Sequence, residues 1–151
     1  MKLLLFISTL VLLATAAANA QSVSGSITGG SVTRGSKARG VITMSIPSGL
    51  HVNSNRPSSQ YAIATTVKVS SSGATTSAVS YPRGANRKFD FSEDTINVYE
   101  GTVRFPFSLT VPKSVSGNVV RVRATVRYQA CTNEVCYPPK TKDITFTAKV
   151  L

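Results

Sequence analysis

One stretch near the end of the chain alternates apolar and polar side chains without a break from residue 120 to residue 128. The apolar positions are Val120, Val122, Ala124, Val126 and Tyr128, and those between them are Arg121, Arg123, Thr125 and Arg127. Successive side chains of a β-strand point to opposite faces of its sheet, so this pattern predicts a strand with one buried face and one basic, solvated face. Residues 143–150 repeat the alternation, and we expect them to pair with the first segment.

Short segments rich in Val, Thr and Ile, spaced by turn residues, continue this pattern through the rest of the chain. We expect strands within residues 41–46, 62–70, 77–81, 96–99 and 102–110, with a brief extended piece at 50–53. No window of helical length carries a convincing apolar stripe. Seven or eight short strands are typical of an all-β domain, and we predict an immunoglobulin-like antiparallel β-sandwich.

The first twenty residues have the form of a secretory signal peptide. Lys2 precedes an uncharged, mostly apolar run, and Ala18-Asn19-Ala20 is a small-residue cleavage site. An uncleaved membrane anchor is the alternative, but polar residues interrupt the run and small residues crowd its end, which favours cleavage. We therefore expect a periplasmic or otherwise exported mature chain that begins at Gln21, without stable membrane insertion.

The mature chain is long enough for one domain. Residues 21–36 are rich in Ser, Gly and Thr, which predicts a flexible lead-in or a weak edge strand, and we expect the ordered domain to span residues 37–151.

The composition excludes several chemistries. His51 is the single histidine, so a site built from several histidines is impossible, and the glycine-rich motifs of nucleotide binding and the serine motif of hydrolases are missing. We expect no metal and no organic cofactor. Lys and Arg number 17 against 6 Asp and Glu, but the basic residues are scattered singly, which favours a solvated basic surface over nucleic-acid binding. Attraction to anionic envelope surfaces or acidic partners is the weaker alternative.

Cys131 and Cys136 are the two cysteines of the chain, and in an exported protein we expect them to pair. They fall between two predicted strands, so the disulfide would close a hairpin tip rather than join two sheets. A loop this small adds only about 2 kcal/mol in the chain-entropy estimate. Spacing alone leaves open a structural staple or a pair that exchanges with a partner's thiols.

The residues around the cysteines resemble a known family. The segment Tyr128-Gln129-Ala130-Cys131 and its continuation Cys136-Tyr137-Pro138-Pro139 resemble the active-site segment of the N-terminal periplasmic domain of the thiol:disulfide interchange protein DsbD. Weaker landmarks agree in order: Gly49-Leu50-His51-Val52-Asn53, Ser80-Tyr81-Pro82 and Val98-Tyr99-Glu100-Gly101. The resemblance covers roughly residues 37–151.

The resemblance implies an immunoglobulin-like domain whose catalytic pair, Cys131 and Cys136, carries reducing equivalents. In the family, electrons come from a membrane-embedded part through a thioredoxin-like domain and pass to disulfide isomerases or cytochrome-maturation proteins. The second cysteine forms the mixed disulfide and the first resolves it. Because the sequence ends at Leu151, we expect a membrane donor or thioredoxin-like partner in trans, and a monomer.

The resemblance also implies a cap loop that shields the cysteines until a partner docks. Residues 83–94, the longest predicted irregular segment, match it, with Phe89 or Phe91 as the covering aromatic. The cap-loop residues are Arg83, Arg87, Lys88, Phe89 and Phe91. The expected surround of the cysteine pair is His51, Asn53, Tyr128, Glu134, Tyr137 and Pro138.

Two departures from the family concern this surround. The matching loop is basic through Arg83, Arg87 and Lys88, where known members have acidic residues, and His51 and Asn53 stand where they have tyrosines. A cationic His51 near Cys136 would favour the thiolate, although a packed strand histidine is the commoner role.

The sequence thus predicts a thiol:disulfide exchange module, which would be a protein-disulfide reductase if active. Cys131 follows the buried face of its strand and is expected to be the more enclosed sulfur; Cys136 is expected to be the more accessible. The alternatives are a non-catalytic immunoglobulin-like binding module with a structural disulfide and, more weakly, a basic surface-binding protein.

Overall fold

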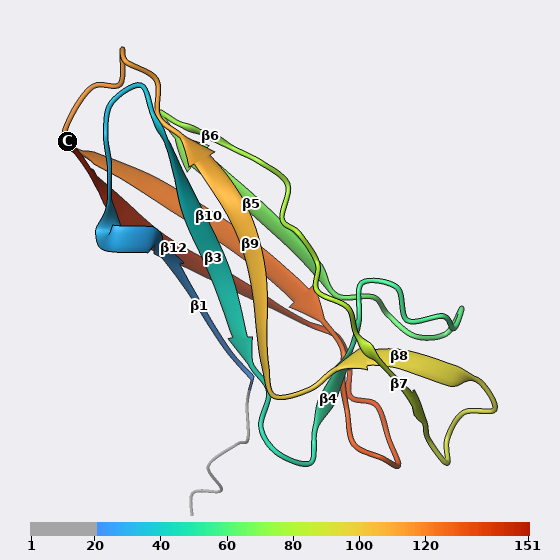
Figure 1. The fold of residues 1–151 in the computed structure, drawn as a ribbon. Coiled ribbons are helices and arrows are strands. Elements are labelled where there is room, and N and C mark those ends of the chain that lie inside the picture. Colours follow the sequence, from blue (N-terminus) through green and yellow to red (C-terminus); the bar gives the residue numbers. More distant parts are fainter. Residues whose placement is uncertain (1–20) are drawn as a thin grey trace, which may run out of the picture.

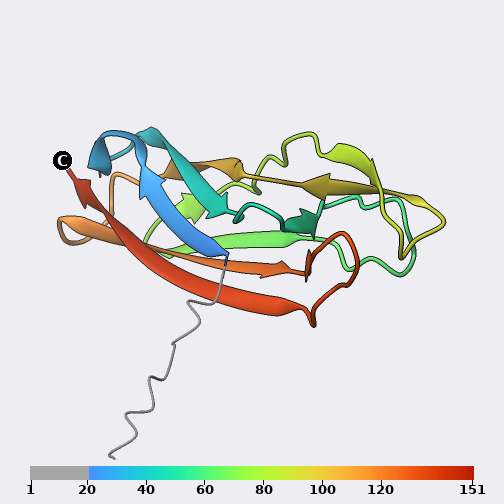
Figure 2. The same ribbon diagram turned by 90° about the horizontal axis from the view of Figure 1, so that it is seen from below.

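The computed structural model describes residues 21–151, and the predicted signal peptide lies outside the described residues. Two four-stranded sheets face each other as layers, and a smaller third sheet extends one end of the molecule (Figure 1, Figure 2). The all-β, immunoglobulin-like sandwich predicted from the sequence is confirmed. The strands are β1 Ser22–Ile27, β2 Ser31–Val32, β3 Lys37–Ser45, β4 His51–Asn53, β5 Thr66–Ser72, β6 Thr75–Thr76, β7 Ala85–Lys88, β8 Thr95–Tyr99, β9 Thr102–Thr110, β10 Val119–Tyr128, β11 Ala130–Cys131 and β12 Lys140–Val150.

The first sheet has the order β2-β12-β10-β5 and contains the segment with the clearest alternation. β10 pairs antiparallel with β12 over its whole length, from Val119 opposite Lys149 to Tyr128 opposite Lys140. The predicted inward residues of β10 are all buried, whereas Arg121, Arg123 and Arg127 are exposed. Apolar burial on one face and solvated charge on the other therefore fix the register of this sheet.

The second sheet has the order β1-β3-β9-β6 and faces the first across the core. Ile42 and Met44 of β3 and Phe105 and Leu109 of β9 are fully buried, so period-two alternation again decides which side chains face inward. The predicted strand at 77–81 is wrong in its position, because the strand here is β6, just before it. Ser77 and Ser80 nevertheless donate backbone hydrogen bonds to the carbonyls of Ser108 and Pro106 on β9.

The lead-in predicted for residues 21–36 is in fact two strands and a short 3-10 turn, Thr28–Gly30. β1 pairs antiparallel with β3 at the edge of its sheet, so the alternative of an edge strand is the correct one. The Ser- and Gly-rich composition conceals an alternation in which Val23, Gly25 and Ile27 face inward. A side chain on Gly25 would clash with the ring of Phe146, so this glycine makes room for core packing.

The third sheet has the order β11-β4-β8-β7 and sits at the end of the sandwich (Figure 1). Its strands extend sandwich strands along the chain: β4 follows β3, β8 leads into β9 at Glu100-Gly101, and β11 follows β10. The strand ladder of the sandwich therefore positions this sheet.

The predicted irregular loop at 83–94 is a β-hairpin instead. β7 pairs with β8 from Ala85 opposite Val98 to Lys88 opposite Thr95, and only the tip, residues 89–94, lies outside the strands. The hairpin projects beyond the core, and β7 buries no side chain. Its sequence is therefore polar and charged and lacks the apolar alternation that would predict a strand. Within residues 21–151, no helix has the length and apolar character needed to span a membrane.

Candidate functional site

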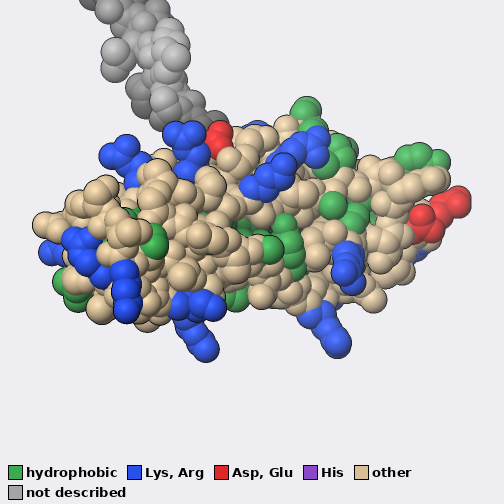
Figure 3. Space-filling model, turned by 90° about the horizontal axis from the view of Figure 1, so that it is seen from above, with side chains coloured by type: hydrophobic (Ala, Val, Ile, Leu, Met, Phe, Trp, Pro, Cys, Tyr) green, Lys and Arg blue, Asp and Glu red, His purple; other side chains and the backbone are tan. Residues whose placement is uncertain are grey.

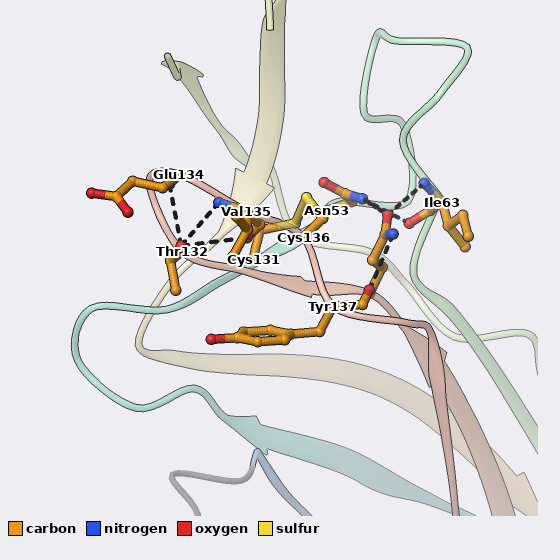
Figure 4. Close-up of a disulfide and its surroundings, with 9 residues drawn as sticks. Asn53, Ile63, Cys131, Thr132, Glu134, Val135, Cys136 and Tyr137 are labelled. Carbon is orange, nitrogen blue, oxygen red and sulfur yellow. Dashed lines mark hydrogen bonds between the residues drawn. A yellow bond between two sulfur atoms is a disulfide. The ribbon is translucent and has the colours of Figure 1, made fainter. Parts of the chain in front are cut away.

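The cysteine pair closes a tight turn that follows β10 and the short strand β11. Thr132 and Val135 face each other across this turn, with the Thr132 amide donating to the Val135 carbonyl at 2.8 Å. The Thr132 hydroxyl oxygen accepts hydrogen bonds from the amides of Glu134 and Val135 at 3.1 Å each (Figure 4). Cys131 and Cys136 therefore lie opposite each other and form a disulfide.

The two cysteines differ sharply in exposure, as the sequence predicts. Cys131 belongs to β11 and is 0% exposed, whereas Cys136 is exposed on the returning arm. Tyr128 is buried in the core, while Glu134, Tyr137 and Pro138 lie exposed around Cys136. A reactant approaching from solvent therefore meets the sulfur of Cys136 first.

His51 is the cross-strand neighbour of Cys131 in the pairing of β4 with β11. The side chain is 2% exposed, and its Nε2 atom has no hydrogen-bond partner. Burial lowers the pKa of His51 below 6.5 and outweighs the opposing attraction of Glu100. Burial therefore disfavours the cationic form of His51 that would favour a thiolate at the cysteine pair.

Two phenylalanines of the hairpin tip continue a stack of rings that begins at His51. The centroids of His51 and Phe89 lie 4.1 Å apart with nearly parallel rings, and Phe91 stacks on Phe89 at 5.2 Å. Phe89 is buried and Phe91 is partly exposed, at 38%. The stack holds the hairpin tip beside the cysteine turn.

Asn53 and Gln129 form a hydrogen-bonded pair of amides, and the sequence gives Gln129 no signal beyond its place in the cysteine motif. The Asn53 amide nitrogen donates to the Gln129 side-chain oxygen at 2.9 Å and to the Ile63 carbonyl at 3.1 Å. Gln129 in turn donates to the Tyr137 carbonyl at 3.3 Å. These bonds tie the loop after β4 to the cysteine turn. They also fix the Asn53 amide so that its oxygen lies on the disulfide side (Figure 4).

The hairpin is less basic at its tip than the sequence comparison suggested. Arg87 forms a salt bridge with Glu100 at 2.9 Å, and the Lys88 ammonium donates to the main-chain carbonyl of Glu93. Arg83, before β7, is exposed away from the tip itself. The exposed acidic residues of the tip are Asp90, Glu93 and Asp94. The basic residues of this segment therefore lie on β7 and before it, whereas its tip carries three acidic residues with the Lys88 ammonium beside Glu93.

An open pocket of about 500 Å³ separates the hairpin tip from the cysteine turn. Cys136, Asn53 and Gln129 line one part of it, and Phe91 lies on the hairpin side. The tip thus flanks Cys136 and leaves it exposed in this disulfide form. Among the described residues, no group of three or more His, Cys, Asp and Glu side chains is placed to hold a metal ion.

These features define a class of protein: an immunoglobulin-like β-sandwich that carries, on a turn at one end, a disulfide between one buried and one exposed cysteine. The family model for the N-terminal domain of thiol:disulfide interchange protein DsbD matches residues 26–148. The chain belongs to this family, which confirms the resemblance seen in the sequence. The match begins within β1 and thus includes most of the segment predicted as a lead-in.

Of three similar solved structures, one supports the same fold. The N-terminal periplasmic domain of ScsB from Proteus mirabilis is 14% identical with a TM-score of 0.51, and the alignment covers 85% of this chain but 45% of that one. The chain thus spans less than half of the ScsB structure. The reduced N-terminal domain of DsbD from Neisseria meningitidis is 15% identical, with a TM-score of 0.45 and coverage of 73% and 80%. The yeast GGA1 GAE domain is 15% identical, with a TM-score of 0.44 and coverage of 87% and 91%. No curated protein sequence matches the chain.

Proposed function

We propose that this protein is a periplasmic thiol:disulfide exchange module that passes reducing equivalents to a partner protein through Cys131 and Cys136. The observation that carries the proposal is the unequal access of the two sulfurs on one turn: Cys131 is buried and Cys136 is exposed. Exchange needs one sulfur that a partner can reach and a second that can attack it from within. A disulfide with a purely structural role does not need this difference in access between its two sulfurs.

The reaction proceeds in two displacements. In the reduced protein, the Cys136 thiolate attacks one sulfur of the partner's disulfide; a mixed disulfide forms and the partner's other sulfur leaves as a thiolate. The Cys131 thiolate then attacks the Cys136 sulfur and expels the partner's second thiolate. Two electrons and two protons pass to the partner, and the Cys131–Cys136 disulfide of the present structure is the product.

The partner in this proposal is a thioredoxin-like protein, as the family membership suggests. The predicted signal peptide supports a periplasmic location, and the similar ScsB domain is described as periplasmic. An exported location also favours the formation of disulfides.

The hairpin tip is proposed to limit access to Cys136. Phe91 and Cys136 line the same pocket, and Phe89 anchors the tip through its stack on His51. Replacing Phe89 and Phe91 together with alanine should speed alkylation of the reduced protein, with Val119→Ala, an exposed apolar residue at the start of β10 that does not line this pocket, as the matched control. Unchanged alkylation kinetics in the double variant would show that the tip does not act as a cap.

The exchange reaction is tested by trapping the mixed disulfide. Cys131→Ser retains the accessible nucleophile and lacks the resolving thiol, so its complex with an oxidised thioredoxin-like protein should accumulate on non-reducing gels. Cys136→Ser is the matched control and should form little complex.

Two results would contradict these assignments. Accumulation with Cys136→Ser instead would reverse the roles of the cysteines. No complex with either variant would favour the alternative, a binding module with a structural disulfide.

A further inference from the structure

The acidic residues of this basic protein gather at the end that carries the cysteines. Of the 6 Asp and Glu residues, Asp143 alone lies on a long sandwich sheet, and the others belong to the cysteine turn, the hairpin tip or the bend after β8. Figure 3 shows acidic side chains at the far end of the hairpin, while Lys and Arg side chains are spread over the remaining surface. Five of the six acidic residues are thus concentrated at one end of a chain whose net charge is +11.

Two of these carboxylates line the pocket beside Cys136. Glu93 and Asp94 lie on its hairpin side. Among residues 21–151, the one salt bridge joins Arg87 to Glu100, so neither pocket carboxylate has a cationic partner. The Lys88 ammonium contacts the main-chain carbonyl of Glu93 and offsets part of the negative charge, but it forms no salt bridge with either carboxylate, so both can interact with a charge from outside the chain.

A second, independent feature of the pocket also points to a hydrogen-bond donor. Asn53 lines it, is 1% exposed, and has a side-chain oxygen without any hydrogen-bond partner. The amide cannot rotate to bury this oxygen elsewhere without losing the bonds from its nitrogen to Gln129 and Ile63. Leaving a buried acceptor unpaired is costly, and a ligand that supplies an N–H group removes the cost.

The rest of the pocket suits the stem of a long cationic side chain. Tyr61 is 83% exposed and Phe91 is 38% exposed, and both line the pocket. Aromatic faces attract ammonium and guanidinium groups, and the methylene stems of Lys and Arg cover apolar surface while the head stays polar. The pocket therefore combines two carboxylates, the unpaired oxygen of Asn53 and two aromatic side chains. This combination favours a cationic group at the end of an apolar side chain.

We propose that the pocket is a subsite for a lysine or arginine side chain that lies close to the reactive cysteine of the disulfide partner. This inference rests on the proposed exchange function and names the chemistry of the partner. A basic side chain in the pocket holds the partner's disulfide against Cys136, and a net positive protein thereby selects a locally basic partner surface.

The experiment compares exchange between the reduced protein and three disulfide-bonded peptides that differ at one position beside the cysteine: Arg, Gln or Glu. Overall charge alone would make the acidic peptide react fastest, because the protein is strongly basic. The subsite predicts the reverse order, with the Arg peptide about tenfold faster than the Glu peptide at low salt, and a smaller difference at high salt.

The variants separate the pocket from the rest of the surface. Glu93→Gln combined with Asp94→Asn should abolish the preference for the Arg peptide, whereas Asp143→Asn, on β12, should leave it intact. Equal rates for the three peptides, or a preference for the Glu peptide, would overturn the subsite while leaving exchange in place. A preference that survives in the double variant would also overturn it. Failure of all three peptides to react would refute the exchange function, and the subsite with it.

Discussion

The two long sheets and the short third sheet of this molecule are built differently. In the sandwich, inward positions are apolar and fully covered, as at Ile42, Phe105 and Val122. In the third sheet, the buried set includes His51 and Asn53, and each retains a polar atom without a partner, as does Tyr128 at the end of β10, which leads into this sheet. Unpaired buried polar atoms each cost about 1–3 kcal/mol, so the short sheet depends on the sandwich for its stability. The difference indicates that the sandwich holds the fold and the short sheet carries the chemistry.

The largest expected effect is on stability, from truncating a ring in each region. Phe105→Ala removes a fully buried ring that packs edge-on against Tyr81 and Tyr99, and should lower the free energy of unfolding by about 3–5 kcal/mol. Phe91→Ala, at the partly exposed hairpin tip, should cost less than about 1 kcal/mol. Urea denaturation of both oxidised variants measures this difference. Equal losses would show that the tip is as integral to the fold as the core.

Reduction of the disulfide should have a smaller effect. The Cys131–Cys136 bond has a sequence separation of 5, and closing so short a loop contributes about 2 kcal/mol at most. We expect the reduced protein to keep its fold and to unfold at a modestly lower urea concentration. Loss of the native circular dichroism spectrum on reduction would instead assign the disulfide a structural role.

Much of the sandwich follows from local alternation, and for that reason it could be predicted. In β10 and its partner β12, the alternation of apolar and polar residues shows which side chains face inward. Cys131 follows β10 closely and is buried like the inward residues of that strand. The strand β1 could not be predicted with the same certainty, because its inward residue Gly25 has no side chain. The space at Gly25 is filled by the ring of Phe146, which is far away in the sequence. The outward positions of β1 are serines, so the sequence of this strand resembles that of a flexible linker.

The surround of the site could be predicted only in part, because it is assembled from distant segments. The cysteine pair stands in a recognisable motif, but the bond between Asn53 and Gln129 joins residues 76 positions apart. The lowered pKa of His51 follows from its burial, and the stack of Phe89 on its ring is shown by no local pattern. Asp90, Glu93 and Asp94 stand in the sequence, but their position in a hairpin tip beside the cysteine turn depends on the pairing of β7 with β8.

The short sheet should also make stability depend on pH. Because the pKa of His51 is lowered in the folded state, the unfolded chain binds more protons as the pH falls below 6.5. The free energy of unfolding should therefore be highest above this pH, fall as the pH drops towards the folded-state pKa, and then level off. His51→Phe should remove this component. Denaturation curves at several pH values would contradict the assignment if both proteins lost stability in parallel.

The smallest expected effect comes from the salt bridge that joins β7 to the bend after β8. Arg87 and Glu100 are both about half exposed, with side-chain accessibilities of 49% and 43%, so solvent screens their attraction. Arg87→Gln should lower the free energy of unfolding by about 0.5 kcal/mol or less. A loss above about 2 kcal/mol would mean that this pair fixes the hairpin.

The most direct test is the equilibrium reduction potential of the Cys131–Cys136 pair, measured against a thioredoxin or glutathione couple. An exchange module is expected to lie within the range of known exchange proteins, between about −270 and −120 mV. A potential below about −300 mV would identify a structural disulfide and contradict the proposed transfer of reducing equivalents.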